Sequence, residues 1–600
     1  MACHFPPALL TRKYIVCGIS KPCGVIRMKF LKSIRIGTHE LLFVGLLVLA
    51  FVIRLGLISQ GWPTTNSDEG TIGLMGLHIA FNGEHPTFYY GQYYMGPHQA
   101  YVAALLFRLF GPSLFMLRFG LLLIFTLFLL SMYLLTRLVY SRGWALFCLF
   151  LLGTGSSFIM ARELTAIGGY TETLLFGSLL FLLASWLVMT YRPYQRSLEC
   201  RWRIVVYLAW GLIAGTSLWD DMLSAPFVLM TGLLLVVFCW RELLQLITPL
   251  AALIGLLVGM FPLLYYNLYA QPGKDSLSVL SGLRSKGGQD MAHILLALQN
   301  SASISVPMMT GEPFCQANEL SIFGPTTSYA LPCALTRSLW GYSYILLLII
   351  ALLLALWGLW SAWREWRINR DAELIEAQWE SRRWLYRQGI HLALLFSALL
   401  TFYLYAFSSA PLDWPGIHAR YLIGFLAVTP AIFWPLWQGF ISVRARMNRL
   451  VQARRIICVA LLTLMGVLLM VGGVDAYTQV PAVHASNERD MILINALTSR
   501  HVTHIYSDYW TCNKLTFLSN ERVICASINS QLKDDHNRYH RYYDLIDADA
   551  KAAYIFPADS AFVVKQGGTY HLPAVDARAQ SSGLTYQVLV IDGYVLYQER

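Results

Sequence analysis

The chain has 600 residues, of which 56% are hydrophobic and only 13% are charged, and its mean hydropathy is +0.51. A soluble protein has about 25% charged residues, so the composition excludes an ordinary soluble protein and indicates one that is solvated mainly by lipid. The net charge of +11 does not indicate a nucleic-acid partner, because the basic residues lie in short loops between apolar segments, as orientation signals do.

Eleven apolar segments are long enough, or nearly so, to cross a bilayer, which takes roughly 17–25 residues. They are 41–58, 114–135, 144–159, 174–190, 204–218, 223–240, 246–266, 342–360, 390–407, 421–441 and 456–474. The apolar segment 99–110 is shorter and carries Arg108, so we expect it to lie flat on the membrane surface. The pattern predicts a multi-pass α-helical membrane protein.

Lysine and arginine residues predict the orientation of these spans, because they concentrate on the cytoplasmic side. A basic segment precedes the first span, and basic clusters recur in the loops that would share its side, at 137–142, 192–203, 241, 364–387 and 444–455. If 99–110 crossed the membrane, the cluster at 192–203 would fall outside. We therefore expect a cytoplasmic N-terminus and an extracytoplasmic C-terminus. The sequence contains no Asn-x-Ser/Thr sequon, which favours a bacterial plasma membrane.

The layout predicts three parts. Residues 1–40 form a basic cytoplasmic N-terminus, residues 41–474 a transmembrane domain, and residues 475–600 an extracytoplasmic α/β domain. The transmembrane domain includes a first outer loop at 60–113 and a large outer loop at 267–337. In the last part a helix pattern fits 489–498, strand patterns fit 504–510, 522–528, 553–556 and 561–564, and Asp592-Gly593 indicates a hairpin at 586–597.

Four of the eleven cysteines fall in the predicted outer regions. In an oxidising compartment they could form the disulfides Cys315–Cys333 and Cys512–Cys525, or remain unpaired thiols, because bridge geometry cannot be read from sequence. The sequence has no CxxC, HExxH or phosphate-loop pattern.

Carboxylates are costly beside hydrocarbon, so acidic residues at a membrane boundary tend to lie in polar cavities that serve a function. Six of them should share the outer rim of the bundle. They are Asp68, Glu69, Glu163, Glu172, Asp220 and Asp221. Asp68 is the candidate catalytic base, since its loop is long and rich in Gly, Tyr and His. The other interpretation, a helix cap or a solvated carboxylate, applies best to Glu172 and Asp221.

Four further residues could contact a sugar or a phosphate at this rim. Tyr90 belongs to an aromatic stretch at 88–94, which would stack on a sugar ring or form an interfacial belt. His98 would be a metal ligand or a general acid–base group, unless it is a structural histidine. Arg162 and Arg420 could hold a phosphate bidentately, or could extend to the interface as long cationic side chains do.

The order of several motifs resembles that of the GT-C glycosyltransferases. The resemblance is to the protein O-mannosyltransferase-like branch that uses polyprenyl-phosphate sugars and includes the lipid A aminoarabinose transferases. It covers most of the membrane part, and its most specific element is the Asp68-Glu69 pair after the first span. The other matching motifs are Tyr-Tyr-Met-Gly-Pro-His-Gln-Ala-Tyr at 93–101, Leu-Phe-Gly-Pro-Ser at 109–113 with Arg118, Ala-Arg-Glu at 161–163, Gly-Gly-Tyr-Thr-Glu at 168–172, Pro-Leu-Leu-Tyr-Tyr-Asn at 262–267 and Ala-Arg-Tyr-Leu at 419–422.

The resemblance implies roles for particular residues. The first-loop aspartate of the family acts as the base, which maps to Asp68, and Glu69 helps to shape the site. Acidic residues of the second outer loop help to bind acceptor or metal, which points to Glu163. Related bacterial sequences often have Glu where this chain has Gln99, so it stays open whether the short helix supplies a carboxylate. We expect the substrate-binding residues to be Arg162, Glu163, Glu172, Asp220, Arg420, Tyr90 and His98.

The implied reaction is a single inverting displacement. Asp68 accepts a proton from an acceptor hydroxyl or amine while the acceptor attacks the anomeric carbon of a polyprenyl-phosphate sugar. Arg420 or Arg162 holds the departing phosphate. The acceptor would be a glycan, a lipid or a protein, and the protein would contact the lipid bilayer but no nucleic acid. No cofactor is required, and a divalent metal is optional, with Asp68 and Glu163 as its candidate ligands.

Two other classes of protein compete with this interpretation. Membrane-embedded carboxylates also mark the pathways of transporters and lipid flippases, but the sequence shows no inverted repeat and no sign of helices broken near the midplane. A non-catalytic scaffold or receptor whose tail binds a partner would not need an acidic pair in a long first loop.

Overall fold

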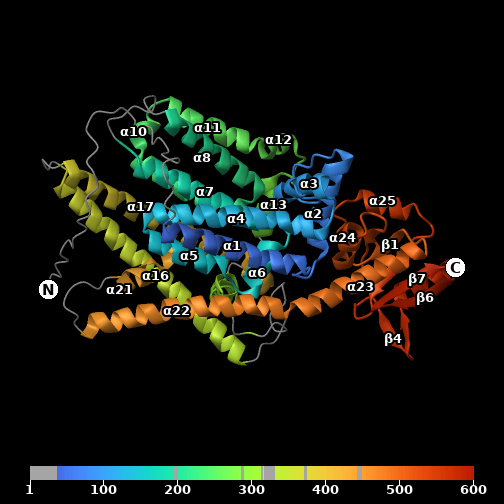
Figure 1. Ribbon diagram of the computed structural model, residues 1–600. Helices are drawn as coiled ribbons and strands as arrows, with labels where there is room; N and C mark the ends of the chain where they lie inside the picture. The colour runs from blue at the N-terminus through green and yellow to red at the C-terminus, as the bar shows by residue number, and fades with distance from the viewer. Residues whose placement is uncertain are drawn as a thin grey trace.

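The computed structural model describes residues 37–192, 201–284, 290–311, 315, 331–370, 375–441 and 449–600. Long helices form a bundle, and a smaller domain that contains strands caps one end of it (Figure 1). Most of the predicted cytoplasmic segment 1–40, and most of residues 312–330 in the large outer loop, lie outside the described residues.

All eleven predicted apolar segments lie in helices. Seven helices, the last of them continuing through α23, are long and apolar enough to cross a membrane: α1 (Thr38–Ser59), α4 (Leu114–Val139), α7 (Tyr170–Met189), α8 (Arg201–Asp220), α16 (Leu331–Ile368), α17 (Ile375–Ala406) and α22 (Arg449–Thr478) with α23 (Val480–Ser499). The shorter α9 (Ala225–Phe238) accounts for one more segment.

The remaining three segments are broken by sharp bends, which the sequence analysis did not expect. The bends are 84° between α5 (Arg142–Gly153) and α6 (Ser157–Leu164), 61° between α11 (Ile247–Gly259) and α12 (Phe261–Tyr269), and 63° between Pro415–Leu422 and Phe425–Ile441. The last pair comprises α19 (Pro415–His418), η5 (Ala419–Leu422), α20 (Phe425–Ile432) and α21 (Trp434–Ile441). Among the described residues, seven to ten crossings follow from length and composition, so the count of eleven stays a prediction.

The outward faces of the long helices are apolar. On α1, for example, Leu41, Val44 and Val48 are each more than half exposed. A row of uncovered aliphatic side chains on a helix of this length is solvated by lipid. The chain is therefore a multi-pass helical membrane protein.

The first outer loop contains two helices, α2 (Ser67–Leu77), extended by η1 (His78–Asn82), and α3 (His98–Phe110). Helix α3 corresponds to the predicted surface segment 99–110; it packs on α2 and α4, exposes Leu105, Leu109 and Phe110, and is not among the candidate spans. The other short helices are η3 (Met222–Ser224), α10 (Trp240–Leu243), α13 (Ser276–Arg284), α14 (Met291–Asn300), η4 (Ser301–Ser305), α15 (Val306–Thr310) and α18 (Ala410–Asp413).

Helices α8 and α11 lie side by side (Figure 1) and touch backbone to backbone. A Cβ at Gly211 would lie 2.0 Å from the carbonyl oxygen of Ala252, and a Cβ at Gly255 would lie 2.2 Å from that of Leu208. Gly215 and Gly259 make equivalent approaches one turn further on. Two facing pairs of glycines four residues apart thus allow the close helix packing that membrane bundles use.

The C-terminal domain, which we call the outer domain after the side that the sequence predicts for it, has an α/β fold, as predicted. Its mixed sheet has the order β2-β1-β3-β7-β6, in which β1 pairs in parallel with β2 and β3. The strands are β1 (His504–Ser507), β2 (Ile524–Ser527), β3 (Ala553–Pro557), β6 (Tyr586–Ile591) and β7 (Tyr594–Glu599), with a separate hairpin of β4 (Val564–Gln566) and β5 (Thr569–His571). The helices are α23, α24 (Tyr509–Leu518), α25 (Arg541–Asp547) and α26 (Pro573–Ser582).

Two strand predictions need correction. The predicted strand 504–510 ends at Ser507, because Asp508 caps α24 by accepting hydrogen bonds from the backbone N and Oγ1 of Thr511 at 3.2 and 2.8 Å. The predicted strand 561–564 is absent, since β4 begins only at Val564. The predicted hairpin at 586–597 is confirmed as β6 and β7.

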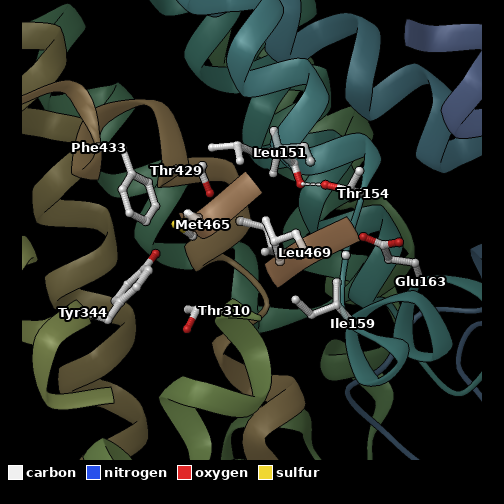
Figure 2. A pocket seen from close by; sticks show the side chains of 13 residues that line it. Leu151, Thr154, Ile159, Glu163, Thr310, Tyr344, Thr429, Phe433, Met465 and Leu469 are labelled. Carbon is white, nitrogen blue, oxygen red and sulfur yellow. Dashed lines mark hydrogen bonds between the residues drawn. The ribbon is translucent and has the colours of Figure 1, made fainter. Parts of the chain in front are cut away.

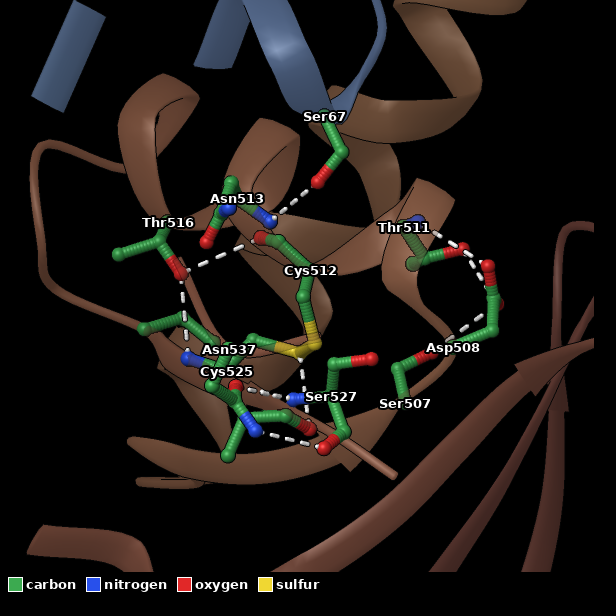
Figure 3. The surroundings of a disulfide bond; sticks show 12 residues. Ser67, Ser507, Asp508, Thr511, Cys512, Asn513, Thr516, Cys525, Ser527 and Asn537 are labelled. Atoms are coloured by element: carbon green, nitrogen blue, oxygen red, sulfur yellow. Dashed lines mark hydrogen bonds between the residues drawn. A yellow bond between two sulfur atoms is a disulfide. The ribbon is translucent and has the colours of Figure 1, made fainter. Parts of the chain in front are cut away.

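Both disulfides that the sequence left open are formed, Cys315–Cys333 and Cys512–Cys525. Figure 3 shows how the second bond ties α24 to β2 beside Ser67 at the start of α2. The bond therefore stiffens the part of the outer domain that faces the membrane bundle.

Substituting Gly255 by Ala should force α8 and α11 apart, because the new methyl group would overlap the backbone of Leu208. Overpacking of this kind costs about 1–3 kcal/mol. We expect a lower thermal unfolding temperature for the Gly255→Ala protein in detergent. The matched control is Gly45→Ala on α1, where a Cβ meets nothing within 4 Å. Equal unfolding temperatures for the two variants would contradict this account of the packing.

Candidate functional site

Asp68 lies in the first turn of α2, where the outer domain meets the bundle. The side chain of Asn66 caps this helix by accepting a hydrogen bond from the backbone N of Glu69 at 3.0 Å. The Asp68 side chain is 18% exposed, so the carboxylate is accessible from outside the protein rather than enclosed by it. A carboxylate in the first turn also has a favourable interaction with the helix dipole.

Two tyrosines and an arginine surround the Asp68 carboxylate. Tyr89 donates a hydrogen bond to Oδ1 at 3.4 Å, Tyr509 of the outer domain donates another to the same oxygen, and Nη2 of Arg538 lies 3.7 Å from it. Tyr89 belongs to the aromatic stretch that the sequence singled out, but Tyr509 and Arg538 were not predicted. No sequence signal joins residues that are 441 positions apart.

Glu69, the neighbour of Asp68, faces the opposite way. Its carboxylate is fully buried and forms a bidentate ion pair with Arg118 of α4, with Nε to Oε1 at 2.9 Å and Nη2 to Oε2 at 2.6 Å. The backbone N of Ala166 donates to Oε1 as well, at 3.3 Å. Both oxygens are thus occupied by the protein itself, which favours a role in shaping the site over direct participation in chemistry.

Arg162 and Arg420 lie within electrostatic range of Asp68, and their role in binding a phosphate stays a prediction. Arg162 of α6 is buried with its guanidinium 4.8 Å above the ring of Phe158. The guanidinium of Arg420, in η5, lies 5.5 Å from the ring centre of Tyr170. The charges of Asp68, Arg162 and Arg420 interact with one another. Two broken spans therefore contribute one cation each to the electrostatic surroundings of the Asp68 carboxylate.

Glu163 lies next to Arg162 in the sequence but points into the bundle. Its Oε2 accepts hydrogen bonds from Nε and Nη2 of Arg54 at 3.0 and 2.7 Å, and both side chains are buried. Glu163 also borders a small cavity that is lined mainly by apolar side chains, as Figure 2 shows. Among the described residues no hydrogen bond or ion pair joins Glu163 to Asp68.

A second acidic cluster forms where α3, α7 and α8 meet. Gln99 donates to Oε2 of Glu172 at 2.9 Å, and His98 Nδ1 lies 2.7 Å from Oδ1 of Asp220. The second oxygens of Glu172 and Asp220 are buried without a hydrogen-bond partner in the described part of the chain. Asp221 caps η3, which agrees with its interpretation as a helix cap. Helix α3 thus supplies an amide here instead of a carboxylate.

Tyr90 does not face Asp68 but belongs to a network that joins the first loop to the outer domain. Nδ1 of the buried His78 lies 2.9 Å from the hydroxyl of Tyr90, which donates to Glu84. Nε2 of His78 lies 3.2 Å from Glu521 and 3.1 Å from the hydroxyl of Tyr542.

The described residues contain no group of three or more His, Cys, Asp or Glu side chains arranged to hold a metal ion. The two candidate ligands, Asp68 and Glu163, instead contact arginines on different sides of the site. Metal dependence stays a prediction.

Removal of Arg118 should destabilise the protein by about 3–5 kcal/mol, because Glu69 would be left as a buried charge without its partner. The Arg118→Met protein should therefore unfold at a clearly lower temperature. The double variant Arg118→Met/Glu69→Leu should recover part of the loss, since apolar residues can replace a buried ion pair. A single variant as stable as the wild type would contradict this role.

Acid should loosen the contact between the first loop and the outer domain. Burial favours a higher pKa for Glu84, but hydrogen bonds from Tyr90 and Tyr539 outweigh it and lower the pKa. The hydrogen bond from His78 lowers the pKa of Glu521 against the opposing effect of burial. Carboxyls with lowered pKa values stabilise the folded state above the unfolded pKa of about 4.3, and this stabilisation is lost as the pH falls through the folded value.

The unfolding temperature should therefore drop as the pH is lowered from about 5 to 3, the range around that unfolded pKa. The double variant Glu84→Gln/Glu521→Gln should show a smaller drop. Glu365→Gln, at an exposed carboxylate, is the matched control and should behave as the wild type. An acid response of the double variant as large as that of the wild type would disprove the assignment.

Comparison with known proteins supports the fold. No family model matches the sequence, and no curated protein matches it at a significant level. Among solved structures, the chain is similar to ArnT from Cupriavidus metallidurans bound to undecaprenyl phosphate, with a TM-score of 0.51 and 12% identity over 93% of this chain and 97% of that chain. It is also similar to the oligosaccharyltransferase AglB from Archaeoglobus fulgidus in complex with an inhibitory peptide and a dolichol-phosphate, with a TM-score of 0.44 and 14% identity over 86% of this chain and 69% of that chain. The likeness to ArnT, which spans nearly the whole of both chains, shows that the two chains share a fold, and this agrees with the GT-C-like architecture that the sequence motifs predicted.

Proposed function

We propose that the protein is a membrane glycosyltransferase that moves a sugar from a polyprenyl-phosphate donor to an acceptor on the extracytoplasmic side. The observation that carries the proposal is the position of one partly exposed carboxylate, Asp68, at the junction of the bundle and the outer domain, within electrostatic range of the cations Arg162 and Arg420. A proton acceptor beside two phosphate-binding groups is what a displacement at a sugar phosphate requires. The fold shared with ArnT, whose structure holds undecaprenyl phosphate, is consistent with this substrate class.

The two arginines are suited to a phosphate. Nε of Arg420 is buried without a hydrogen-bond partner among the described residues, and an unsatisfied guanidinium donor is costly unless a ligand accepts its hydrogen bond. A planar guanidinium can hold two phosphate oxygens at once. We therefore assign the binding of the leaving phosphate to Arg420, and Arg162 adds a second positive charge nearby.

The reaction then follows from these positions. The Asp68 carboxylate takes the proton of an acceptor hydroxyl or amine, and the freed electron pair forms a bond to the anomeric carbon. The bond from that carbon to the phosphate oxygen breaks, and polyprenyl phosphate leaves with the electron pair. A single displacement inverts the anomeric centre.

A flippase for lipid-linked sugars is the second candidate, and the three bent spans favour it, because broken helices are common in transporters. The two functions differ in their products. A flippase moves the labelled lipid across a vesicle membrane without consuming it, whereas a transferase converts it to free polyprenyl phosphate.

Substitution of Asp68 by Asn should lower the turnover number about 10²–10⁴-fold, which is the usual contribution of a general base. The assay uses purified protein in liposomes with a panel of polyprenyl-phosphate sugars and measures release of polyprenyl phosphate. Mass spectrometry of cell-envelope glycans with and without the protein supplies the acceptor. The exposed Asp413→Asn is the matched control. Wild-type turnover in the Asp68→Asn protein would refute the base assignment, and lipid movement without release would favour the flippase.

A further inference from the structure

We infer that Tyr509 and Arg538, both supplied by the outer domain, are positioning residues that hold the Asp68 carboxylate in its reactive orientation. The inference rests on the proposed function and adds a second domain to its site. The membrane bundle alone would then provide the base but not its orientation.

The contacts at Asp68 are unequal on its two oxygens. Oδ1 accepts hydrogen bonds from Tyr89 at 3.4 Å and from Tyr509, and it faces Nη2 of Arg538 at 3.7 Å. Oδ2 accepts no hydrogen bond from any residue that the structure describes. With one oxygen fixed by the protein, the other is left to meet the acceptor proton.

Arg538 determines the direction in which the Tyr509 hydroxyl donates. Nε of Arg538 donates to the oxygen of Tyr509 at 3.0 Å, so this oxygen acts as an acceptor toward Arg538 and its proton is directed to Asp68. Burial, and next the charge of Asp68, raise the pKa of Tyr509, which keeps the hydroxyl protonated as a donor. The two hydrogen bonds therefore run in one direction, from Arg538 to Tyr509 and from Tyr509 to Asp68, and each can strengthen the other.

The Arg538 guanidinium is itself fixed by aromatic rings. It lies 5.3 Å from the ring centre of Tyr89 and 5.5 Å from that of Tyr509, within the range of cation–π attraction. The loop at Gly91 is in van der Waals contact with the same residue, since a Cβ there would lie 3.4 Å from the backbone and from Cδ of Arg538. The first outer loop and the outer domain thus immobilise the same side chain from two sides.

Close packing of α24 on α2 keeps Tyr509 in register with Asp68. A Cβ at Gly70 would lie 2.5 Å from the backbone of Asn513, and a Cβ at Gly73 would lie 2.6 Å from the ring of Phe517. The backbone N of Asn513 also donates to Oγ of Ser67 at 3.1 Å (Figure 3). Two helices that meet without room for a methyl group transmit any displacement of the outer domain directly to the first turn of α2.

The test is steady-state kinetics of the full-length protein in liposomes with a polyprenyl-phosphate sugar that the wild type uses. Tyr509→Phe keeps the ring and removes only the hydroxyl, so we expect kcat to fall about 10- to 100-fold, as for a misoriented catalytic group, with an unchanged KM for the lipid donor. Arg538→Met should produce a similar loss, and Arg538→Lys should restore part of it, because a cation returns to the same place. The double variant Tyr509→Phe/Arg538→Met should lose little more than either single variant, since the two residues act as a unit.

Tyr586→Phe, elsewhere in the outer domain, is the matched control and should keep wild-type kinetics. Tyr509→Phe should also unfold at the wild-type temperature. A kcat within twofold of the wild type in Tyr509→Phe, or a failure of Arg538→Lys to exceed Arg538→Met, overturns the inference while leaving the proposed function intact. A wild type that transfers no sugar from any donor overturns both.

Discussion

The first turn of α2 is packed between the membrane bundle and the outer domain. Its position is therefore fixed by contacts on both sides. On one side Glu69 is anchored by Arg118 of α4, and on the other α24 packs against Gly70 and Gly73. Successive residues of a helix point about 100° apart, because a turn takes 3.6 residues. The same turn can therefore direct Glu69 into the bundle and Asp68 toward the polar rim, which explains why two adjacent carboxylates have opposite environments.

Other buried carboxylates in the bundle are also paired with an arginine, as Glu69 is with Arg118. Arg54 pairs with Glu163, and Arg203 pairs with Glu242 through two hydrogen bonds of 2.8 Å. Each pair joins distant segments of the chain, so the cost of burying the charges is offset only in the correct arrangement of helices. Asp68 differs from these carboxylates because its nearest arginine is 3.7 Å away and its side chain is partly exposed.

Hydropathy predicted the positions of the helices well, because lipid imposes a length and an apolar surface on every span. It could not predict the bend between α5 and α6, which depends on the backbone near Thr154–Ser156 and on neighbours far away in the sequence. The motifs named Asp68, Arg162 and Arg420 as candidate site residues, and their roles stay predictions. The roles of Glu163 and Tyr90 as substrate contacts stay predictions. In the structure their side chains are held by Arg54 and His78, partners that no local sequence pattern reveals. Tyr509 and Arg538 lay beyond sequence reasoning for the same reason.

Placing part of the site on the outer domain has a mechanical consequence. The helix formed by α22 and α23 runs almost without interruption from the bundle into the outer domain (Figure 1), so the domain is attached to the bundle by a stiff connection as well as by the contact at α2. Two attachments restrict rigid-body motion more than one flexible linker does, because a tilt about α2 would have to bend the long helix. The disulfide Cys512–Cys525 also restricts movement of α24 relative to the sheet, because it joins the helix to β2. A base whose orientation depends on a second domain needs such restraint, since errors in position of about 1 Å can cost a catalytic group 10²-fold in rate.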